Sequence, residues 1–334
     1  MLYEIRCCIA IKIESNNKFF CSIILKIYIM KKIIRTLILL FVPVSLAAQL
    51  TPVTNQYVLN PISINPAYAG NRGALNIAAF YRRQWVGIKG APETITLAGD
   101  LPFMDTKLGL GLIISSDKIG VTKEIRLNTQ YSYRIKMKTG SLSMGLGAGL
   151  MTTNTAWSDL VVIDPGDEYY LINSRVFIVP DFNFGVYYTN KSYFAGFSIP
   201  KLIGYKFDFD RNKYTLKVNM GKYNYLFNTG YMFSLSEKVR LLPSTLISFT
   251  PGEKLLYDIN AHVILFDKLW TGLSYRSNRS FTALAQFAVN KQLKIAYTYD
   301  FDFGNLRKYS YGSHEIMIRY EFRYVVNVAN PLIF

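Results

Sequence analysis

Residues 125–137 read IRLNTQYSYRIKM, in which apolar or aromatic side chains alternate with polar ones along the whole stretch. A period of two places successive side chains on opposite faces, so the pattern predicts a β-strand with one apolar and one polar face. The stretch is longer than the strands of about five or six residues that are common in soluble sheets, and it suits a tilted crossing of a bilayer. Because similar stretches recur along the chain, we predict a transmembrane β-barrel.

The first 48 residues have a different composition, which is typical of export. A cationic start at residues 30–35 leads into an apolar run, and residues 45–48 end in small side chains that suit cleavage. We therefore expect residues 1–29 to be an upstream extension or a misassigned start, and residues 30–48 to be a signal peptide. The functional chain then begins near Gln49 and is long enough for one large barrel.

The three cysteines, Cys7, Cys8 and Cys21, all lie in the segment that we expect to be removed. The mature chain therefore offers no disulfide, no zinc–cysteine site and no thiol nucleophile. The removed segment also holds seven Lys or Arg and two Glu, which lowers the net charge from +16 to +11. In an exported protein this basic excess suits an anionic membrane surface or partner, and we expect no nucleic acid partner.

After the expected signal peptide the chain has no apolar run of about 18 residues, which excludes a helical membrane span. Tyr and Phe are abundant, with 25 and 22 copies in the whole chain. An exported, aromatic and alternating chain of this kind predicts a protein of the bacterial outer membrane, in contact with its lipid and lipopolysaccharide.

Turn residues divide the chain after Gly73 into fourteen expected strands. They run near residues 73–84, 92–101, 106–116, 122–137, 140–154, 180–189, 191–199, 219–235, 237–249, 254–266, 268–276, 279–289, 291–302 and 313–323. The alternation is poor in the seventh and twelfth of these, so twelve or sixteen strands are alternatives. The fold that we predict is all-β: a transmembrane antiparallel up-and-down β-barrel at residues 73–323, preceded by a periplasmic or plug segment at 49–72 and followed by a tail at 324–334.

The connections between the expected strands alternate in length. Short links fall near residues 103–105, 138–140, 190–191, 236–237, 266–267 and 290–291. Longer links fall at residues 84–91, 116–121, 155–179, 200–218 and 303–312, and the same series includes the short links 250–253 and 276–278. Outer-membrane barrels have tight periplasmic turns and longer external loops, so both termini are expected on the periplasmic side.

The clean periods also predict which side chains face lipid and which face the lumen. The lipid-facing set is Tyr223, Tyr225, Phe227, Tyr231, Phe233, Leu293, Ile295, Tyr297 and Tyr299. The lumen-facing set is Arg126, Arg134, Lys136, Asp258, His262, Gln292, Lys294 and Thr298. An Arg or Lys turned toward lipid at the middle of the bilayer costs roughly 2–4 kcal/mol, which strongly favours this assignment.

No motif in the sequence favours catalysis. The run GLGAG at residues 145–149 has glycines at a period of two inside an expected strand, so it clears space on the lumen face rather than binding phosphate. Gly109 and Gly111 are interpreted in the same way. The two histidines, His262 and His314, have no clustered metal ligands, and no Gly-x-Ser-x-Gly motif is present. The acidic run at residues 164–168 is expected to be a loop turn. We predict no enzyme activity, no cofactor and no metal.

Residues 56–70, QYVLNPISINPAYAG, precede the first expected strand and are too apolar for a solvated tail. The two Asn-Pro steps disfavour a helix or a regular strand. The segment is expected to pack into the barrel mouth as a plug or to bind a partner, and its candidate partner-binding residues are Asn60, Pro61, Asn65, Pro66, Tyr68 and Gly70.

A second segment, residues 81–94, reads YRRQWVGIKGAPET and joins cationic and aromatic side chains to a Gly/Pro turn. Two interpretations remain open, an aromatic girdle followed by a solvated turn and an inward-folded recognition loop. Its candidate partner-binding residues are Arg82, Arg83, Gln84, Trp85, Gly87, Gly90 and Pro92.

Three sequence motifs carry a family resemblance: NPAYAG at residues 65–70, the pattern R-x-Q-W-x-G-x-x-G-x-P at 82–92, and YGSHEI at 311–316. In this order they resemble the PorP/SprF family of outer-membrane proteins in Bacteroidota, and the similarity runs from about Gln49 to the last strand. The resemblance implies a non-enzymatic barrel of the type IX secretion system that serves secretion or surface attachment of cargo such as gliding adhesins. It also implies two kinds of partner, periplasmic ring components of that system and secreted cargo with a type B C-terminal domain.

The alternative is a transporter for small hydrophobic molecules, since fatty-acid channels are also fourteen-stranded and have an N-terminal hatch with Asn-Pro-Ala. The segment before the first strand is short for such a hatch, and the clean strands have polar lumen faces. A general porin is a third alternative, which a plug and a basic lumen disfavour.

Overall fold

The computed structural model describes residues 55–103, 107–159, 173–208 and 213–322 of the 334-residue chain. The expected signal peptide, the acidic run at 164–168 and the tail at 324–334 lie outside the described residues. In the described part, no helix is long and apolar enough to cross a membrane.

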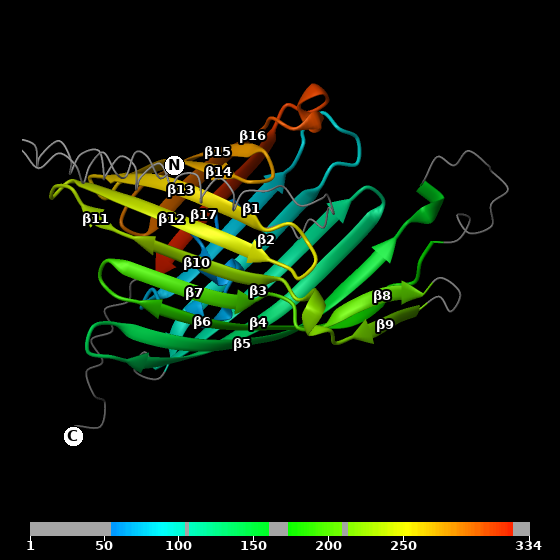
Figure 1. The fold of residues 1–334 in the computed structure, drawn as a ribbon, viewed down its shortest axis with the longest axis horizontal. Helices are drawn as coiled ribbons and strands as arrows, with labels where there is room; N and C mark the ends of the chain where they lie inside the picture. Colours follow the sequence, from blue (N-terminus) through cyan, green and yellow to red (C-terminus); the bar gives the residue numbers. More distant parts are fainter. Residues whose placement is uncertain (1–54, 104–106, 160–172, 209–212, 323–334) are drawn as a thin grey trace, which may run out of the picture. The chain divides into compact units, whose positions relative to one another are not determined.

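Fourteen antiparallel strands form a closed ring (Figure 1). Each strand pairs with its neighbours along the chain, β10 pairs with both β7 and β12, and the first strand β1 closes the ring by pairing with the last strand β17. The register is continuous along each pair, as in β4 and β5, where Thr122 lies opposite Thr155 and Lys136 opposite Ser141. Among the described strands of the ring, closure leaves no terminal edge strand. The prediction of a fourteen-stranded up-and-down barrel is confirmed.

The strands of the ring agree closely with the expected ranges. They are β1 (Leu75–Arg83), β2 (Glu93–Phe103), β3 (Leu108–Ile119), β4 (Thr122–Lys136), β5 (Ser141–Thr155), β6 (Phe177–Thr189), β7 (Tyr193–Ile199), β10 (Tyr225–Tyr231), β12 (Val239–Phe249), β13 (Leu256–Leu265), β14 (Leu269–Arg276), β15 (Ser280–Ala288), β16 (Leu293–Asp302) and β17 (Ser313–Phe322). A short strand β11 (Phe233–Ser234) continues the pairing of β10 with β12.

The alternation of residues 125–137 has the predicted structural meaning. On β4 the side chains of Leu127 and Tyr131 are exposed on the outer face, whereas those of Asn128 and Gln130 are buried inside. The same holds on β16, where Tyr297 is exposed. The outer face of the ring is thus an apolar and aromatic surface, which suits contact with lipid.

Three details differ from the expectations. Tyr223 is buried rather than lipid-facing, because β10 starts only at Tyr225 and the period of two does not extend into the preceding 3-10 helix, Met220–Lys222. The expected longer link at residues 116–121 is shorter, because β3 continues to Ile119. The expected loop at 200–218 contains a hairpin of β8 (Gly204–Asp208) and β9 (Lys213–Lys217).

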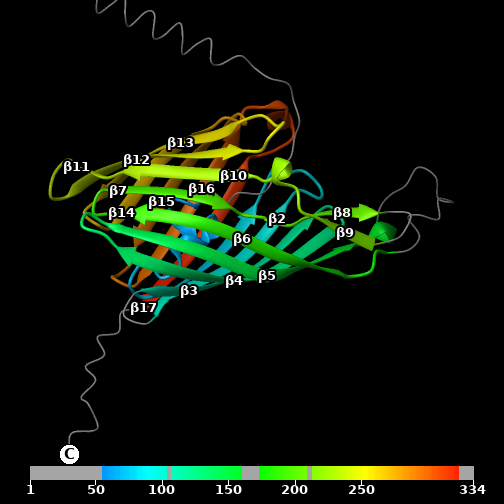
Figure 2. The ribbon, with the colours of Figure 1, turned by 60° about the horizontal axis from the view of Figure 1, so that its bottom comes forward.

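Six short connections lie together at one end of the barrel (Figure 2), whereas the short links β3–β4 and β14–β15 lie at the other end with the long loops. We call the end with the six short connections the short-turn mouth; it contains the connections β2–β3, β4–β5, β6–β7, β11–β12, β13–β14 and β15–β16. The opposite end, which includes the β8–β9 hairpin, is the long-loop end (Figure 1).

Candidate functional site

The described residues before β1 form a compact segment inside the barrel, which we call the plug (residues 55–73). Two 3-10 helices, Pro61–Ser63 and Pro66–Tyr68, each have proline in the first turn, where its fixed φ and missing N–H are tolerated. Asn65 caps the second helix, since its side-chain oxygen accepts a hydrogen bond of 3.0 Å from the Ala67 amide. The Asn-Pro steps therefore specify two tight turns rather than a strand.

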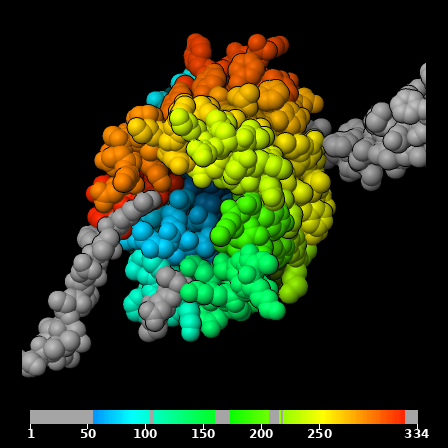
Figure 3. Space-filling model, turned by 90° about the vertical axis from the view of Figure 1, so that its left-hand side faces the viewer, coloured from blue at the N-terminus to red at the C-terminus, as the bar shows by residue number. Residues whose placement is uncertain are grey.

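The plug runs through the lumen. Its first residue, Asn55, donates its amide to Glu315 Oε2 at 3.1 Å, near the start of β17 at the long-loop end. Its end is at the short-turn mouth, where Arg72 precedes β1 (Figure 3 shows the blue segment inside this mouth, beside a hollow). Loop parity predicts the segment on the periplasmic side; the structure instead places its described start deep in the barrel.

Hydrogen bonds tie the plug to strands all around the barrel. Asn65 Nδ2 donates to the carbonyls of Val186 on β6 (3.0 Å) and Phe197 on β7 (3.1 Å). Other bonds of this kind are Ser132 Oγ to the Ala69 carbonyl, Ser198 Oγ to the Ile64 carbonyl, the Gly70 amide to Asp100, and Asn260 Nδ2 to the Tyr57 hydroxyl. A buried polar group without a hydrogen-bond partner is costly, and these bonds to the wall avoid that cost. They therefore fix the path of the plug through the lumen.

Glycines on the inner wall make room for the plug. A Cβ at Gly145 would lie 2.3 Å from the Ala67 amide nitrogen, and one at Gly109 would lie 2.0 Å from the Ala69 carbonyl oxygen. The interpretation of these glycines as residues that clear the lumen face is confirmed. Any larger residue at either position would displace the plug.

Two apolar clusters hold the plug from opposite sides. Leu59 and Ile62 pack with Phe80, Met317 and neighbours from β1, β2, β15, β16 and β17. Tyr57 and Ile64 pack with Leu226 of β10 and Leu246 of β12. The lumen is therefore a mixed core rather than the polar interior that the strand pattern predicts.

A buried ionic cluster lies beside the start of the plug. Arg82 contacts Glu315 at 3.3 Å and Asp300 at 3.4 Å, and the side-chain amide of Asn55 also donates to Asp300. Next to it, Arg276 Nη2 contacts Asp258 at 3.0 Å and Arg276 Nη1 donates to Asn55 Oδ1 at 2.9 Å. Buried ions of this kind need close pairing, and the first plug residue completes it.

The motif at residues 82–92 meets the motif at 311–316. The Trp85 amide donates to Ser313 Oγ at 3.1 Å, the Val86 amide to the Gly312 carbonyl at 2.9 Å, and the Tyr311 amide to the Val86 carbonyl at 2.7 Å. Gly87, with φ of +102°, lies against Tyr311. Sequence segments more than two hundred residues apart thus form one contact at the long-loop end.

The candidate partner-binding residues fall into two groups. The buried ones are Asn60, Pro61, Asn65, Pro66, Gly70 and Arg82. The exposed or half-buried ones are Tyr68, Arg83, Gln84, Trp85, Gly87, Gly90 and Pro92. Tyr68 is half-buried in the short-turn mouth, where its ring packs edge-on against Tyr187 with centroids 5.2 Å apart. The other members of the second group lie at the long-loop end.

The candidate lumen residues are spread along the barrel rather than gathered in one site. Arg126 contacts Asp181 at 3.3 Å, and the fully buried His262 lies edge-on to Trp270. Asp258 belongs to the ionic cluster, and Lys294 pairs with Glu321 at 2.8 Å near the short-turn mouth. Arg134 is half-buried, and Lys136 is exposed at the end of β4.

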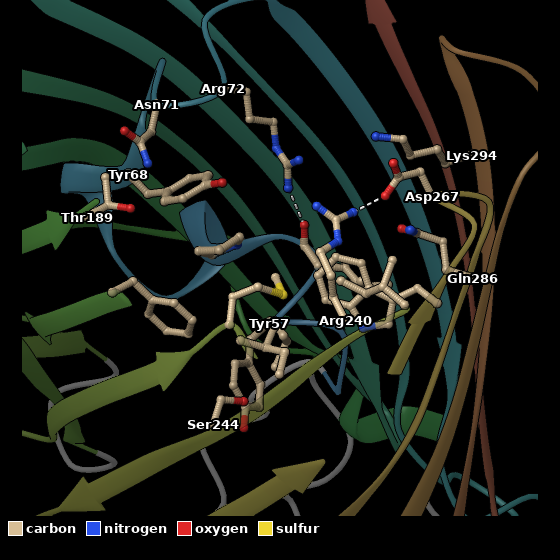
Figure 4. A pocket seen from close by; sticks show the side chains of 18 of the residues that line it. Tyr57, Tyr68, Asn71, Arg72, Thr189, Arg240, Ser244, Asp267, Gln286 and Lys294 are labelled. Carbon is tan, nitrogen blue, oxygen red and sulfur yellow. Dashed lines mark hydrogen bonds and ion pairs between the residues drawn. The ribbon is translucent and has the colours of Figure 1, made fainter. Parts of the chain in front are cut away.

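The short-turn mouth encloses a cavity of about 750 Å³ between the plug and the wall (Figure 4). Arg72 and Arg319 both donate to the Leu59 carbonyl in its floor, and Arg240 pairs with Asp267 across its side. Sequence reasoning missed these arginines as site residues. The signal that the sequence offered for a cationic mouth was a lysine in each of the six connections at this end.

These features define a class of protein: an outer-membrane β-barrel whose lumen is occupied by its own N-terminal segment. The chain belongs to the PorP/SprF family, because the family profile described as type IX secretion system membrane protein PorP/SprF matches residues 46–320. It is accordingly a non-enzymatic membrane component of the type IX secretion system, located in the outer membrane. The resemblance based on the three sequence motifs is confirmed.

No protein with a curated description matches the sequence. Among solved structures, the CymD monoaromatic hydrocarbon channel is 10% identical with a TM-score of 0.49, covering 84% of this chain and 95% of that chain. The Ralstonia pickettii toluene transporter TbuX is 10% identical with a TM-score of 0.48, covering 78% and 92%. The Acinetobacter baumannii outer membrane protein Omp33 is 8% identical with a TM-score of 0.44, covering 75% and 98%.

Proposed function

We propose that this barrel serves the type IX secretion system as a docking component, which aids secretion or surface attachment of cargo such as gliding adhesins. Its partners are periplasmic ring components and secreted cargo with a type B C-terminal domain. Family membership over residues 46–320 is the observation that carries this proposal. Lipid and lipopolysaccharide surround the apolar outer face.

The occupied lumen supports docking over transport. A closed barrel has no sheet edge to offer, so a partner has to bind at the two ends. The plug packs against the wall in apolar clusters, and buried ions of the wall itself, such as Arg82 and Glu315, lie beside it. Such an interior is a poor path for the small hydrophobic molecules of the alternative function, because a hydrophobic molecule offers a buried charge neither a hydrogen bond nor an opposite charge. By the rule of short periplasmic turns, the short-turn mouth faces the periplasmic ring.

The test is a gene replacement in the source bacterium with Asn65→Ala, Pro66→Ala and Tyr68→Ala together. We expect the variant barrel to insert and to leave type B cargo in the periplasm, because the plug end that shapes the short-turn mouth is altered. Heat-modifiable mobility of the barrel on gels verifies insertion, and immunodetection of cargo at the cell surface and in the medium measures export.

A matched control changes three exposed residues of the long-loop end, Lys89→Ala, Lys118→Ala and Lys123→Ala. Export should persist in this control. Normal export by the plug variant, present at the wild-type level in the outer membrane, would remove the plug from the function.

A further inference from the structure

Each of the six connections at the short-turn mouth contains an exposed lysine. We call these the turn lysines: Lys107, Lys138, Lys191, Lys238, Lys268 and Lys291. In the described part of the same connections, the carboxylates are Glu237 and Asp267, and Asp267 pairs with Arg240. The short-turn mouth is therefore rimmed by cations in excess, and a rim of one sign attracts ligands of the other.

Cations also line the cavity inside this rim. Lys294, Arg240 and Arg72 line it (Figure 4), and so does the buried Arg319. Among the described lining residues Asp267 is the one carboxylate. The buried Glu321 of β17 contacts Lys294 at 2.8 Å and Arg72 at 3.5 Å. Pairing by these two carboxylates leaves the cavity with a clear positive excess.

The position of these cations favours a protein segment over a lipid headgroup. Lipid reaches only the outside of the wall, whereas Arg240 and Lys294 line a cavity inside it. Their arrangement also favours a chain over a single small anion, because the cations come from the β6–β7 connection, β12 and β16, around a large part of the ring. A volume of about 750 Å³ lies within the range of ligand pockets.

The cavity wall also suits a peptide. Tyr68, Tyr193, Phe194 and Trp270 line it with aromatic rings, which pack against peptide backbone and aliphatic side chains. We propose that the short-turn mouth binds an acidic, extended peptide segment of a periplasmic protein, in which several Asp or Glu side chains pair with the turn lysines and with Arg240. This inference deepens the proposed function and rests on it for the existence of a protein partner.

The test measures binding of a fluorescein-labelled octaglutamate peptide to the purified full-length mature protein in phosphatidylcholine nanodiscs. Octaglutamine is the control peptide. The informative variant is Lys191→Gln/Lys268→Gln/Lys291→Gln, three exposed side chains without an ion pair among the residues that the structure describes. The matched control, Lys89→Gln/Lys118→Gln/Lys123→Gln, removes the same charge from the long-loop end.

We expect octaglutamate to bind the wild type, octaglutamine not to bind, and the Kd for octaglutamate to rise about tenfold in the mouth variant at low ionic strength. The control variant should bind as the wild type does, and added salt should weaken binding in both. Equal losses in both variants, or no octaglutamate binding to the wild type, would overturn the proposal.

Two further arms identify a different ligand. If inorganic phosphate binds the mouth at a saturable site and octaglutamate does not, the site takes a small anion and the proposal fails. If the mouth variant differs from the wild type only in phosphatidylglycerol nanodiscs, the lysines contact lipid and the proposal also fails. Peptide binding is measured on the purified protein, without secretion. A failed export test would therefore leave a positive binding result unchanged, and a failed binding test would leave a positive export result unchanged.

Discussion

The side-chain oxygen of Asn65 occupies the space that a side chain at Gly185 would take: a Cβ built there would lie 2.0 Å from Asn65 Oδ1. The plug and the wall are thus fitted to each other at this position. The roles of Asn65 and Gly185 have to be interpreted together, because the sequence around either residue alone does not indicate the contact between them.

Asn65→Ala should lower the free energy of unfolding by about 1–3 kcal/mol, because the carbonyls of Val186 and Phe197 and the Ala67 amide each lose a buried partner. Urea unfolding of the barrel in detergent micelles, followed by tryptophan fluorescence, measures this change. Asn71→Ala is the control, because the structure gives the half-buried Asn71 side chain no hydrogen bond within the described residues. Similar unfolding curves for the two variants would mean that Asn65 does not anchor the plug.

Gly145→Ala should destabilise the folded barrel by roughly 1–3 kcal/mol, since the new methyl group would overlap the backbone of Ala67 and Pro66. Gly99→Ala on β2 is the matched control, because its Cβ would meet the nearest atom at an ordinary 3.6 Å. The temperature at which the folded gel band converts to the unfolded band compares the two variants. We expect a clear decrease for Gly145→Ala alone; an equal temperature for both would show that the wall does not need space there.

Glu315→Ala should lower the free energy of unfolding by about 3–5 kcal/mol, because Arg82 keeps only one carboxylate partner and the backbone amide of Asn55 loses its acceptor. Combining it with Arg82→Met should recover part of the loss, and the coupling free energy from the double-mutant cycle measures the contact. Arg83→Met is the control: this neighbour is exposed on the opposite face of β1 and should change stability by less than about 0.5 kcal/mol. Purely additive effects of Glu315→Ala and Arg82→Met would contradict a direct interaction.

Much of the barrel could be predicted because its physical signal is local. In β4 the alternation of Leu127, Asn128 and Thr129 records which side of the wall each residue faces, and lipid tolerates few exceptions. The alternation of apolar and polar residues does not show where a strand begins or ends. Tyr223 continues the aromatic period of β10 in sequence and still lies outside the strand. The polar run before Gly120 forms the end of β3 rather than a loop.

The site was less predictable, because it depends on contacts between distant segments. The Asn-Pro phrase identified the plug, but nothing near Asn65 in the sequence indicates that β6 and β7 receive its amide. Arg72 and Arg319 were missed for the same reason, since they meet at the Leu59 carbonyl only after the plug has entered the lumen. The lysines of the short connections were visible individually, and only the closed ring brings them to one mouth.

The position of the plug can be tested by a disulfide between Ala69→Cys and Gly111→Cys, because a Cβ at Gly111 would lie 3.4 Å from the Ala69 Cβ. This separation is close to that of natural disulfides. The end of the Ile62 side chain has to move, and Gln130, whose Cβ would be 3.3 Å away, has to shift slightly. The cysteines of the chain lie at positions 7, 8 and 21, ahead of the expected signal cleavage site, so the mature variant has no other thiol. Leu112→Cys in place of Gly111→Cys is the control, since that side chain is exposed on the outer face.

Mass spectrometry of tryptic peptides from oxidised outer membranes is the most direct measurement. We expect the Ala69→Cys/Gly111→Cys variant to yield the linked peptide pair, which reductant separates, and the Ala69→Cys/Leu112→Cys variant to yield none. If the first variant folds and inserts but both of its thiols remain free, the N-terminal segment does not lie inside the barrel.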